Sequence, residues 1–565
     1  MRKWWKEAVG YQIYPKSFYD ANGDGIGDLR GIIEKLDYLS ELGIDLIWLC
    51  PIYKSPMDDN GYDVSDYYGI APEFGTMDDF KELLEQAKKR GIRLIMDLVL
   101  NHTSDEHPWF QEALKKDSPY RDFYIWHPGG GKGKAPNNWG SFFTPSCWEW
   151  EPASEEYYMH IFSKKMPDLN WRHRPMREKL YEMARYWLDL GVDGFRVDAV
   201  AHLERCWDFE DSQLSGHGPY REDWSKFSNL PKVHDYLQEM HREVFSHYDI
   251  VTVGEVGGDA GIEAALKYAG TGSKQLDMVF TFDHCWMNRG WNSSEPSWDN
   301  GTDLYWLKQT FKKWQTGLYG KAWNPLYWLN HDHPRVMSQY GDPVHYPKES
   351  GKMLATALMF MWGTPFIYNG EEIGMTNPNY EKLEDYQDAS TLEKARKLLD
   401  RGHDPELVMR FVQTTSRDNG RTPMQWSSDA DGGFGSLQPW LKMNGNYKQV
   451  NVAKQLADGD SLLSYYKKLI GLRKHSDYKD VVVYGDFSLF DEYHANVFAY
   501  LRTFEGATLL VACNFFSETT HLGLGPLKLE TLVVSNYPDA LLFEGTLCLR
   551  PYEAAVYVLD PSKNS

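Results

Sequence analysis

The sequence predicts an α/β protein, a (β/α)8 barrel with an inserted B domain, followed by a C-terminal antiparallel β-sandwich. Short apolar runs alternate with amphipathic helical stretches through most of the 565 residues, as strands and helices do in such a barrel. Several of the apolar runs end abruptly in acidic residues. From about residue 480 the chain changes to short alternating runs, which are typical of an antiparallel β domain.

Eight strands are expected between residues 9 and 368, because eight short apolar runs read as strands buried on both faces. They are residues 9–14, 44–49, 93–98, 195–197, 251–253, 278–280, 326–329 and 365–368. Apolar residues at helical spacing predict helices between and after them. These are residues 29–42, 80–90, 176–190, 233–245, 262–268, 304–314, 353–360 and 462–473. The alternation, and not any one segment, predicts the barrel.

Two long insertions are expected in the barrel. Residues 103–167 are rich in Trp, Gly and Pro and too long for a simple loop, so they predict a small B domain that overhangs the active face. A second insertion, from about 377 to 435, follows the eighth strand. The barrel then comprises residues 1–102 and 168–479, and the C-terminal β domain comprises residues 480–565.

The composition indicates which kinds of molecule the protein binds. The net charge of −21 disfavours nucleic acid and anionic membrane, whereas a neutral substrate is compatible with it. The N-terminal stretch has no apolar signal region, no run of about 18 apolar residues occurs, and the six cysteines are scattered without a CxxC motif. We therefore expect a cytoplasmic protein with reduced thiols that acts on a small molecule, as a monomer or a weak dimer.

Three acidic residues stand at the ends of predicted strands. Asp198, Glu255 and Asp332 each follow an apolar run, and a barrel collects its catalytic groups at the carboxyl ends of its strands. Arg196 lies two positions before Asp198, on the same side of that strand. A structural ion pair would explain Arg196 and Asp198 by themselves. Three such strand ends indicate an active site.

Two reaction classes fit three carboxylates with flanking Arg and His. One is metal-assisted hydrolysis or isomerisation, and the other is glycoside hydrolysis through a glycosyl-enzyme intermediate. The sequence has no HExxH, and its only HxH lies at residues 331–333, so the second class is favoured. In that interpretation Arg196 keeps Asp198 ionised with a lowered pKa, as a nucleophile requires.

The other two acids then receive complementary roles. Glu255 has no cation adjacent in sequence, so a raised pKa and the role of general acid are expected. Asp332, between His331 and His333, would hold sugar hydroxyls and stabilise the oxocarbenium-like transition state.

An acidic loop near the N-terminus has the spacing of a cation site. Oxygen-bearing groups recur at alternate positions with glycine at the bend, which suits one structural Ca²⁺. A Gly/Asp-rich turn without metal is the alternative. No organic cofactor is expected. The candidate ligands are Asp20, Asn22, Asp24, the carbonyl of Ile26, and Asp28.

Sequence motifs along nearly the whole chain resemble one family. They are YQIYPKSF (11–18), NGYDVSDY (60–67), DLVLNH (97–102), GFRVDA (194–199), NHDHPR (330–335), YNGEEIGM (368–375) and RDNGRTPMQW (417–426). Together they resemble the α-amylase superfamily of glycoside hydrolases (family 13), in its oligo-1,6-glucosidase and α-glucosidase branch. The resemblance implies the barrel with its B and C-terminal domains, a retaining mechanism, the same three acidic roles and the same Ca²⁺ loop.

The resemblance also implies a closed pocket for one non-reducing glucose, and hence exo-action on gluco-oligosaccharides. Asp59 and Arg417 match the pair that caps this pocket. Its walls match Tyr62, His102, Phe143, Phe162, Arg196 and His331. For Phe143 and Phe162, core packing is the alternative.

Ala199, directly after the predicted nucleophile, bears on the linkage. In the family, Val at this place tends to accompany α-1,6 preference, and Thr or Ala accompanies α-1,4 preference. Ala removes β-branched bulk beside the leaving sugar. We expect an α-glucosidase that favours short α-1,4 substrates such as maltose, with α-1,6 preference as the alternative. The chain departs from many relatives at Met166 and His333, where Gln is common.

Three further alternatives rank lower. Trehalose-6-phosphate hydrolase would want a basic cluster at the mouth, where only Lys164 and Lys165 offer one. Sucrose isomerase would need an Arg-rich loop after the sixth strand, where residues 282–290 read FDHCWMNRG. A non-catalytic relative would have lost the three carboxylates, which are all present here.

Overall fold

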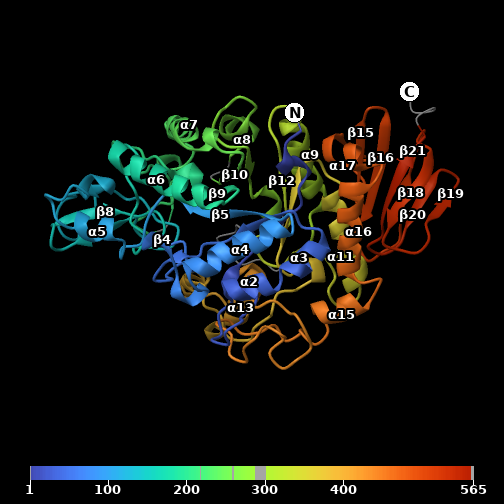
Figure 1. Ribbon diagram of the computed structural model, residues 1–565, viewed down its shortest axis with the longest axis horizontal. Coiled ribbons are helices and arrows are strands. Elements are labelled where there is room, and N and C mark those ends of the chain that lie inside the picture. Colours follow the sequence, from blue (N-terminus) through green and yellow to red (C-terminus); the bar gives the residue numbers. More distant parts are fainter. Residues whose placement is uncertain (1, 217, 258–259, 287–300, 561–565) are drawn as a thin grey trace. The chain divides into compact units, whose positions relative to one another are not determined.

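A computed structural model describes residues 2–216, 218–257, 260–286 and 301–560 (Figure 1). Eight strands form one parallel sheet, a near-closed barrel, in the order β11-β10-β9-β5-β2-β1-β13-β12. They are β1 (Gly10–Ile13), β2 (Leu46–Leu49), β5 (Arg93–Val99), β9 (Gly194–Asp198), β10 (Val251–Glu255), β11 (Met278–Phe280), β12 (Pro325–Leu326) and β13 (Thr364–Tyr368). The predicted barrel and its eight strands are confirmed, although β12 has only two residues.

The chain divides into two compact units. The first comprises residues 1–47, 89–92 and 282–565, and the second comprises residues 48–88 and 93–281. The three predicted domains follow other boundaries and stay a prediction. Among the described residues, none of the helices is long and apolar enough to cross a membrane.

In the second unit, β5, β9, β10 and β11 are consecutive parallel neighbours. Register places Arg196 of β9 between Asp97 of β5 and Val253 of β10. Cβ atoms alternate between the two faces of a strand, so the register carries charged residues of neighbouring strands to one side. Helices α6 (Arg174–Leu190), α7 (Val233–Glu243) and α8 (Ile262–Ala269) come from this unit.

The insertion at 103–167 contains its own small sheet. Strands β6 (Trp126–His127), β8 (Glu156–Met159) and β7 (Trp148–Glu151) pair antiparallel in that order, and helix α5 (Pro108–Ala113) precedes them. Buried side chains that include Trp139, Trp148 and Met159 form its core. The Trp-rich composition therefore supplies the apolar core of a small layered element.

In the first unit, β1 pairs with β13 and β13 pairs with β12. The predicted helix at 29–42 is divided at Lys35 into α2 (Leu29–Glu34) and α3 (Leu36–Leu42). Asp28 caps α2 by accepting the Gly31 N–H at 2.7 Å. Further helices of this unit are α9 (Leu304–Leu318), α11 (Pro347–Met359) and α16 (Leu462–His475).

The insertion after the eighth strand is mainly helical. Helices α12 (Ala389–Asp400) and α13 (Pro405–Thr415) follow one another and share an apolar core that includes Leu398, Val408 and Phe411. Asp388 and Asp404 cap their first turns through side-chain oxygens.

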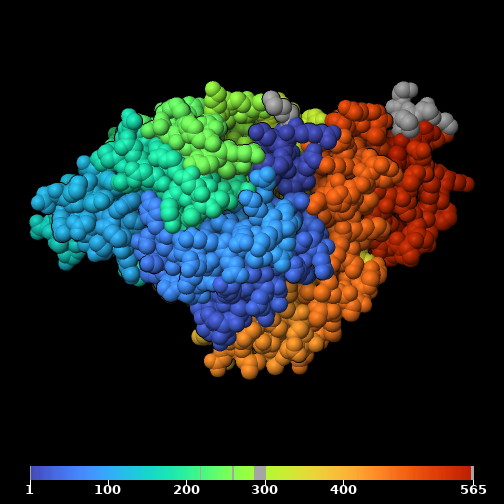
Figure 2. All heavy atoms as spheres, in the orientation of Figure 1, coloured from blue at the N-terminus to red at the C-terminus, as the bar shows by residue number. Residues whose placement is uncertain are grey.

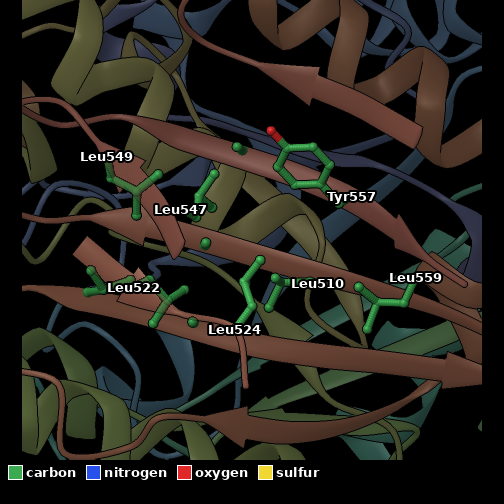
Figure 3. Close-up of a cluster of buried hydrophobic side chains, with 11 residues drawn as sticks. Leu510, Leu522, Leu524, Leu547, Leu549, Tyr557 and Leu559 are labelled. Atoms are coloured by element: carbon green, nitrogen blue, oxygen red, sulfur yellow. The ribbon is translucent and has the colours of Figure 1, made fainter. Parts of the chain in front are cut away.

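The C-terminal region is an antiparallel β domain, as predicted. It has a five-stranded sheet, β14-β15-β16-β21-β18, and a three-stranded sheet, β17-β20-β19. The strands are β14 (Asp486–Phe490), β15 (Val497–Phe504), β16 (Ala507–Asn514), β17 (Thr520–Gly523), β18 (Leu529–Ser535), β19 (Leu541–Phe543), β20 (Thr546–Leu549) and β21 (Ala554–Leu559). Leucines from both sheets meet in one core (Figure 3).

The sequence prediction was wrong for one apolar segment of this region. Residues 481–485, VVVYG, were expected among the strands, but the structure has helix α17 (Lys479–Tyr484) there. Val481, Val482 and Val483 are all buried, and α17 contacts α16 and β15. Tertiary packing overrides the β preference of valine, which is a weak intrinsic bias.

Candidate active site

Arg196 lies at the centre of an acidic cluster in the second unit. Its Nη1 lies 2.5 Å from Oδ1 of Asp97 and 2.5 Å from Oδ1 of Asp198. Its Nη2 lies 2.8 Å from Oε2 of Glu255. The guanidinium is 1% exposed and lies over the rings of Trp48 and Tyr62. One buried cation therefore holds carboxylates from β5, β9 and β10 together.

The proton balance of Asp198 differs from the sequence prediction. Burial raises the pKa of Asp198 well above its usual range, and the negative charges of Glu255 and Asp97 add to the rise against the opposing effect of Arg196. The expected lowered pKa is therefore wrong for the protein without substrate. Asp198 and Glu255 also share a side-chain hydrogen bond. Two carboxyl groups in such contact disfavour ionisation of both at once, which is part of the reason that the pKa of Asp198 is raised.

Ala199 fixes the position of Glu255 through its backbone. It has a left-handed conformation, with φ 46° and ψ 32°, which is uncommon for a residue other than glycine. Its N–H donates to Oε2 of Glu255 at 3.0 Å. Although Glu255 has no cation beside it in the sequence, the fold gives it both this N–H and Arg196. Unusual backbone conformations of this kind cluster at functional sites.

The predicted aromatic walls of the second unit contact each other. His102 Nε2 lies 3.2 Å from the backbone oxygen of Tyr62, and burial lowers the pKa of His102 to about 3, so its ring is neutral at pH 7. The Phe162 ring lies 5.2 Å from that of His102 and 5.5 Å from that of Phe143. Both phenylalanines stay partly exposed, and their contacts fit either a pocket wall or core packing.

Asp59, the predicted cap of the pocket, lies on a loop held by Asp63. Oδ1 of Asp63 accepts the Asp59 N–H at 3.0 Å, and Oδ2 accepts the Asp58 N–H at 2.8 Å. Burial raises the pKa of Asp63 to about 6 despite these hydrogen bonds. The pairing of Asp59 with Arg417 stays a prediction, because the two residues belong to different units.

Asp332 is surrounded by cations in the first unit. Its Oδ1 lies 2.8 Å from Arg421 Nη2 and 3.2 Å from Arg417 Nη1, and its Oδ2 lies 3.4 Å from His331 Nε2. Burial would raise the pKa of Asp332, but His331, Arg417 and Arg421 outweigh it and hold the pKa far below its usual range. Asp332 is thus permanently ionised, as expected for a group that stabilises positive charge.

His331 and Arg417 are themselves held in place. His331 Nδ1 lies 2.9 Å from Gln12 Nε2, and the Tyr14 ring stacks on the His331 ring at 5.7 Å. Arg417 Nη2 donates to Oδ1 of Asp388 at 2.6 Å. Second contacts of this kind fix the orientation of the groups that face a substrate.

The predicted cation loop is compact and lies beside residues 434–440. Asp20 accepts the N–H groups of Gly23 and Gly25, each at 2.7 Å. Asp20 and Asp28 are both buried, and the charge of Asp20 adds to a rise in the pKa of Asp28 that burial dominates. A cation between these like charges would offset both effects, so the residues fit Ca²⁺. In the described ranges no group of three His, Cys, Asp or Glu forms a metal cluster; this loop relies also on amide and carbonyl oxygens.

The structure brings the predicted residues together in two groups. Arg196, Asp198, Ala199 and Glu255 form one group in the second unit, and His331, Asp332 and Arg417 form the other in the first unit. The segment weighed for sucrose isomerase, residues 282–290, lies in part outside the described residues, from 287 on.

Sequence reasoning missed three supporting residues, Trp48, Asp388 and Arg421, and gave no role to a fourth, Asp97. Trp48 Nε1 donates to Asp97 at 2.8 Å, which keeps that carboxylate beside Arg196. A signal for Asp97 was present, because it is an acid inside the apolar run LIMDLV. Asp388 had no such signal, since its contact with Arg417 joins residues 29 positions apart in an insertion.

A carboxylate and a carboxylic acid side by side can attack a carbon centre and protonate a leaving oxygen, which is the chemistry of glycoside hydrolysis. The family model of the alpha-amylase catalytic domain matches residues 12–485. An oligo-1,6-glucosidase of Parageobacillus thermoglucosidasius is 50% identical over 98% of this chain and 99% of its own. An alpha-glucosidase of Pediococcus pentosaceus is 46% identical over 99% of each chain. The crystal structure of a trehalose-6-phosphate hydrolase from Bacillus licheniformis, 43% identical, covers 99% of this chain and 100% of that one with a TM-score of 0.91.

Proposed function

Because the chain belongs to the α-amylase family of glycoside hydrolases and is an exo-glucosidase of the α-glucosidase class, we propose that it releases glucose from the non-reducing end of short α-1,6-linked gluco-oligosaccharides with retention of configuration. The observation that carries the proposal is the cluster of Asp97, Asp198 and Glu255 around Arg196. The choice of α-1,6 bonds in this proposal is supported by the 50% identity to an oligo-1,6-glucosidase.

In the proposed reaction, Glu255 donates a proton to the glycosidic oxygen while Asp198 attacks the anomeric carbon. Glu255 then accepts a proton from water, which hydrolyses the glycosyl-enzyme bond. Arg196 keeps the charge of Asp198 compensated. Asp332, ionised by its arginine neighbours, would stabilise the positive charge that develops on the sugar.

An α-1,4 preference is the second candidate, and Ala199 favours it. The absence of β-branched bulk directly after Asp198 leaves room for a differently angled leaving sugar. A contact of this size is worth about 1–3 kcal/mol, which biases the linkage without forbidding either one. Similarity to named relatives supports α-1,6 cleavage more strongly than this single residue supports α-1,4 cleavage.

Initial rates of glucose release test the proposal. Isomaltose, maltose, sucrose and trehalose 6-phosphate are compared at equal concentration, and the anomer first formed is followed by proton NMR. We expect isomaltose to be fastest, α-glucose to appear first, and the Asp198→Asn variant to be inactive with its fold retained. Faster maltose cleavage would reverse the linkage assignment, and full activity of Asp198→Asn would refute the mechanism.

We also propose that Asp20, Asn22, Asp24, Ile26 and Asp28 hold one structural Ca²⁺. When bound, the ion would neutralise the buried charges of Asp20 and Asp28 and stabilise the loop. Elemental analysis of the purified protein should find one calcium per chain, and chelation should lower Tm without changing the choice of substrate. The variant Asp24→Ala should contain no calcium and should have a Tm that chelation does not change.

A further inference from the structure

A cavity of about 350 Å³ lies in the second unit, apart from the predicted active-site residues. Its walls come from η3 (Arg121–Phe123), the first residues of β6 and β8, and two later segments of the chain. The residues that matter for its chemistry are Lys116, Arg121, Trp126, Glu156, Asn170 and Trp207. None of them has a role in the reaction proposed above. The insertion that supplies most of them reaches the molecular surface, light blue to cyan in Figure 2.

Three charged groups of the cavity, Lys116, Arg121 and Glu156, are paired with one another, and the exposed Asp122 adds a negative charge to its rim. Arg121 donates to Glu156, and Lys116 Nζ lies 3.7 Å from Oε2 of the same carboxylate. The Arg121 and Glu156 side chains are only 11% and 23% exposed. An ionic ligand would have to compete with these pairs. A neutral ligand with several hydroxyl groups can instead use the remaining donors and acceptors of adjacent opposite charges.

The remaining walls are partly apolar, and their polar groups are hydrogen-bonded within the protein. The Arg121 guanidinium lies 3.4 Å from the centre of the Trp126 ring, and the Trp126 N–H donates to the Arg121 carbonyl at 2.9 Å. Trp207 donates to Glu204 at 2.7 Å. Asn170 donates to the Asp122 carbonyl at 3.0 Å. The tryptophan rings offer apolar contact to a sugar ring, while hydrogen bonds to its hydroxyl groups would come from the charged side chains of the cavity.

We propose that this cavity binds a second molecule of neutral gluco-oligosaccharide or glucose, outside the active site. The choice of ligand rests on the proposed function, and the paired charges and the tryptophans support it independently. A volume of about 350 Å³ is at the lower end of the range for ligand pockets, about 300–1,000 Å³, and suits one or two hexose rings. Bound sugar would contact the insertion without being hydrolysed there.

Fluorine NMR of the full-length Asp198→Asn protein labelled with 5-fluorotryptophan tests the proposal. Isomaltose is added up to 100 mM, and the signals of Trp126 and Trp207 are assigned by Trp→Phe replacement. We expect both signals to shift along one saturation curve, while the signal of Trp306, which is exposed on α9, stays unchanged. Unchanged Trp126 and Trp207 signals at 100 mM isomaltose and 100 mM glucose would overturn the proposal.

A pair of neighbouring lysines supplies a matched control. Lys116→Ala should weaken the binding seen at Trp207 at least threefold, whereas Lys115→Ala, which removes a lysine paired with Glu112 outside the cavity, should not. Neither variant should change kcat/KM for isomaltose. Equal binding in both variants would contradict the assignment. The glucose-release assay on the wild-type protein tests the proposed function, and the fluorine signals test the second binding site. Failure of one proposal can therefore be told from failure of the other.

Discussion

Ala199 combines an unusual backbone conformation with a position next to the predicted nucleophile. Ala199→Val adds a β-branched side chain at φ 46°, a backbone conformation in which β-branched residues are outliers. The same bulk should hinder an α-1,4-linked leaving sugar more than an α-1,6-linked one. We expect kcat/KM for maltose to fall about tenfold or more relative to isomaltose, together with a lower Tm.

Ala199→Gly serves as the control for that substitution. Glycine adopts the left-handed conformation without strain, so this variant should keep its Tm and its maltose activity. An unchanged ratio of maltose to isomaltose activity in Ala199→Val would show that residues elsewhere determine the linkage.

Glu371 is a fully buried acid whose titration can be isolated. Burial raises its pKa to about 8, although Tyr466 donates to it at 2.8 Å. Because the folded pKa lies above the unfolded one, Glu371 contributes stability below pH 4.5, and this contribution is lost as the pH rises to 8. Glu371→Gln stays neutral and keeps an acceptor for Tyr466. Its Tm relative to wild type should rise from pH 4.5 to 8 and then level off.

The partly exposed Glu349 of α11 provides the comparison for Glu371→Gln. Glu349→Gln should leave the pH dependence of Tm parallel to that of wild type. A Glu371→Gln curve that is also parallel to wild type would contradict the raised pKa.

At the scale of elements, two buried arginines close the C-terminal end of α11. Arg473 of α16 donates to the carbonyls of Met359 at 3.1 Å and Gly363, and Arg502 of β15 donates to the carbonyl of Phe360. Burial lowers the pKa of Arg473 to about 9 and that of Arg502 to about 10. The last carbonyls of a helix have no partner within the helix. The two guanidinium groups donate hydrogen bonds to these buried carbonyls, which would otherwise lack a partner.

Arg473→Met should therefore destabilise the protein without touching the chemistry. Each buried carbonyl left unsatisfied costs about 1–3 kcal/mol. We expect a clear fall in Tm with an unchanged KM for isomaltose. Lys468→Met, on an exposed position of the same helix, should leave Tm near that of wild type. An equal Tm for both variants would exclude the capping role of Arg473.

Elements also show how far the sequence could predict this molecule. The eight strands were predictable because continuous apolar runs and their acidic ends are local features. Helix α17 was not, because three valines favour a strand until their burial between α16 and β15 decides otherwise. Likewise Asp198 and Glu255 were visible at strand ends, whereas the raised pKa of Asp198 depends on burial and on Glu255, 57 positions away, which only the folded chain brings near it.

At the scale of the whole molecule, two sets of buried ionisable groups act on stability in opposite directions as the pH falls. Burial lowers the pKa of six histidines to about 3 or 4; they are His102, His107, His160, His202, His284 and His333. Burial raises the pKa of Asp63 and Asp97 to about 6. The depressed histidines lose their contribution as the pH falls below 6.5, because the unfolded state then binds more protons, whereas the acids gain stability below about 6.

The pH dependence of Tm between 6.5 and 4 is the balance between these histidines and the buried acids, which also include Asp198 and Glu371. Each group changes the free energy of unfolding by about 1.4 kcal/mol per pH unit within its window. His160→Gln removes one titrating group and should reduce the slope of Tm against pH in this range. His345→Gln, at a side chain that is 76% exposed, should leave the slope unchanged. Equal slopes in both variants would show that the His160 ring is protonated in the folded protein, because only a ring kept neutral by burial couples folding to proton uptake by the unfolded chain.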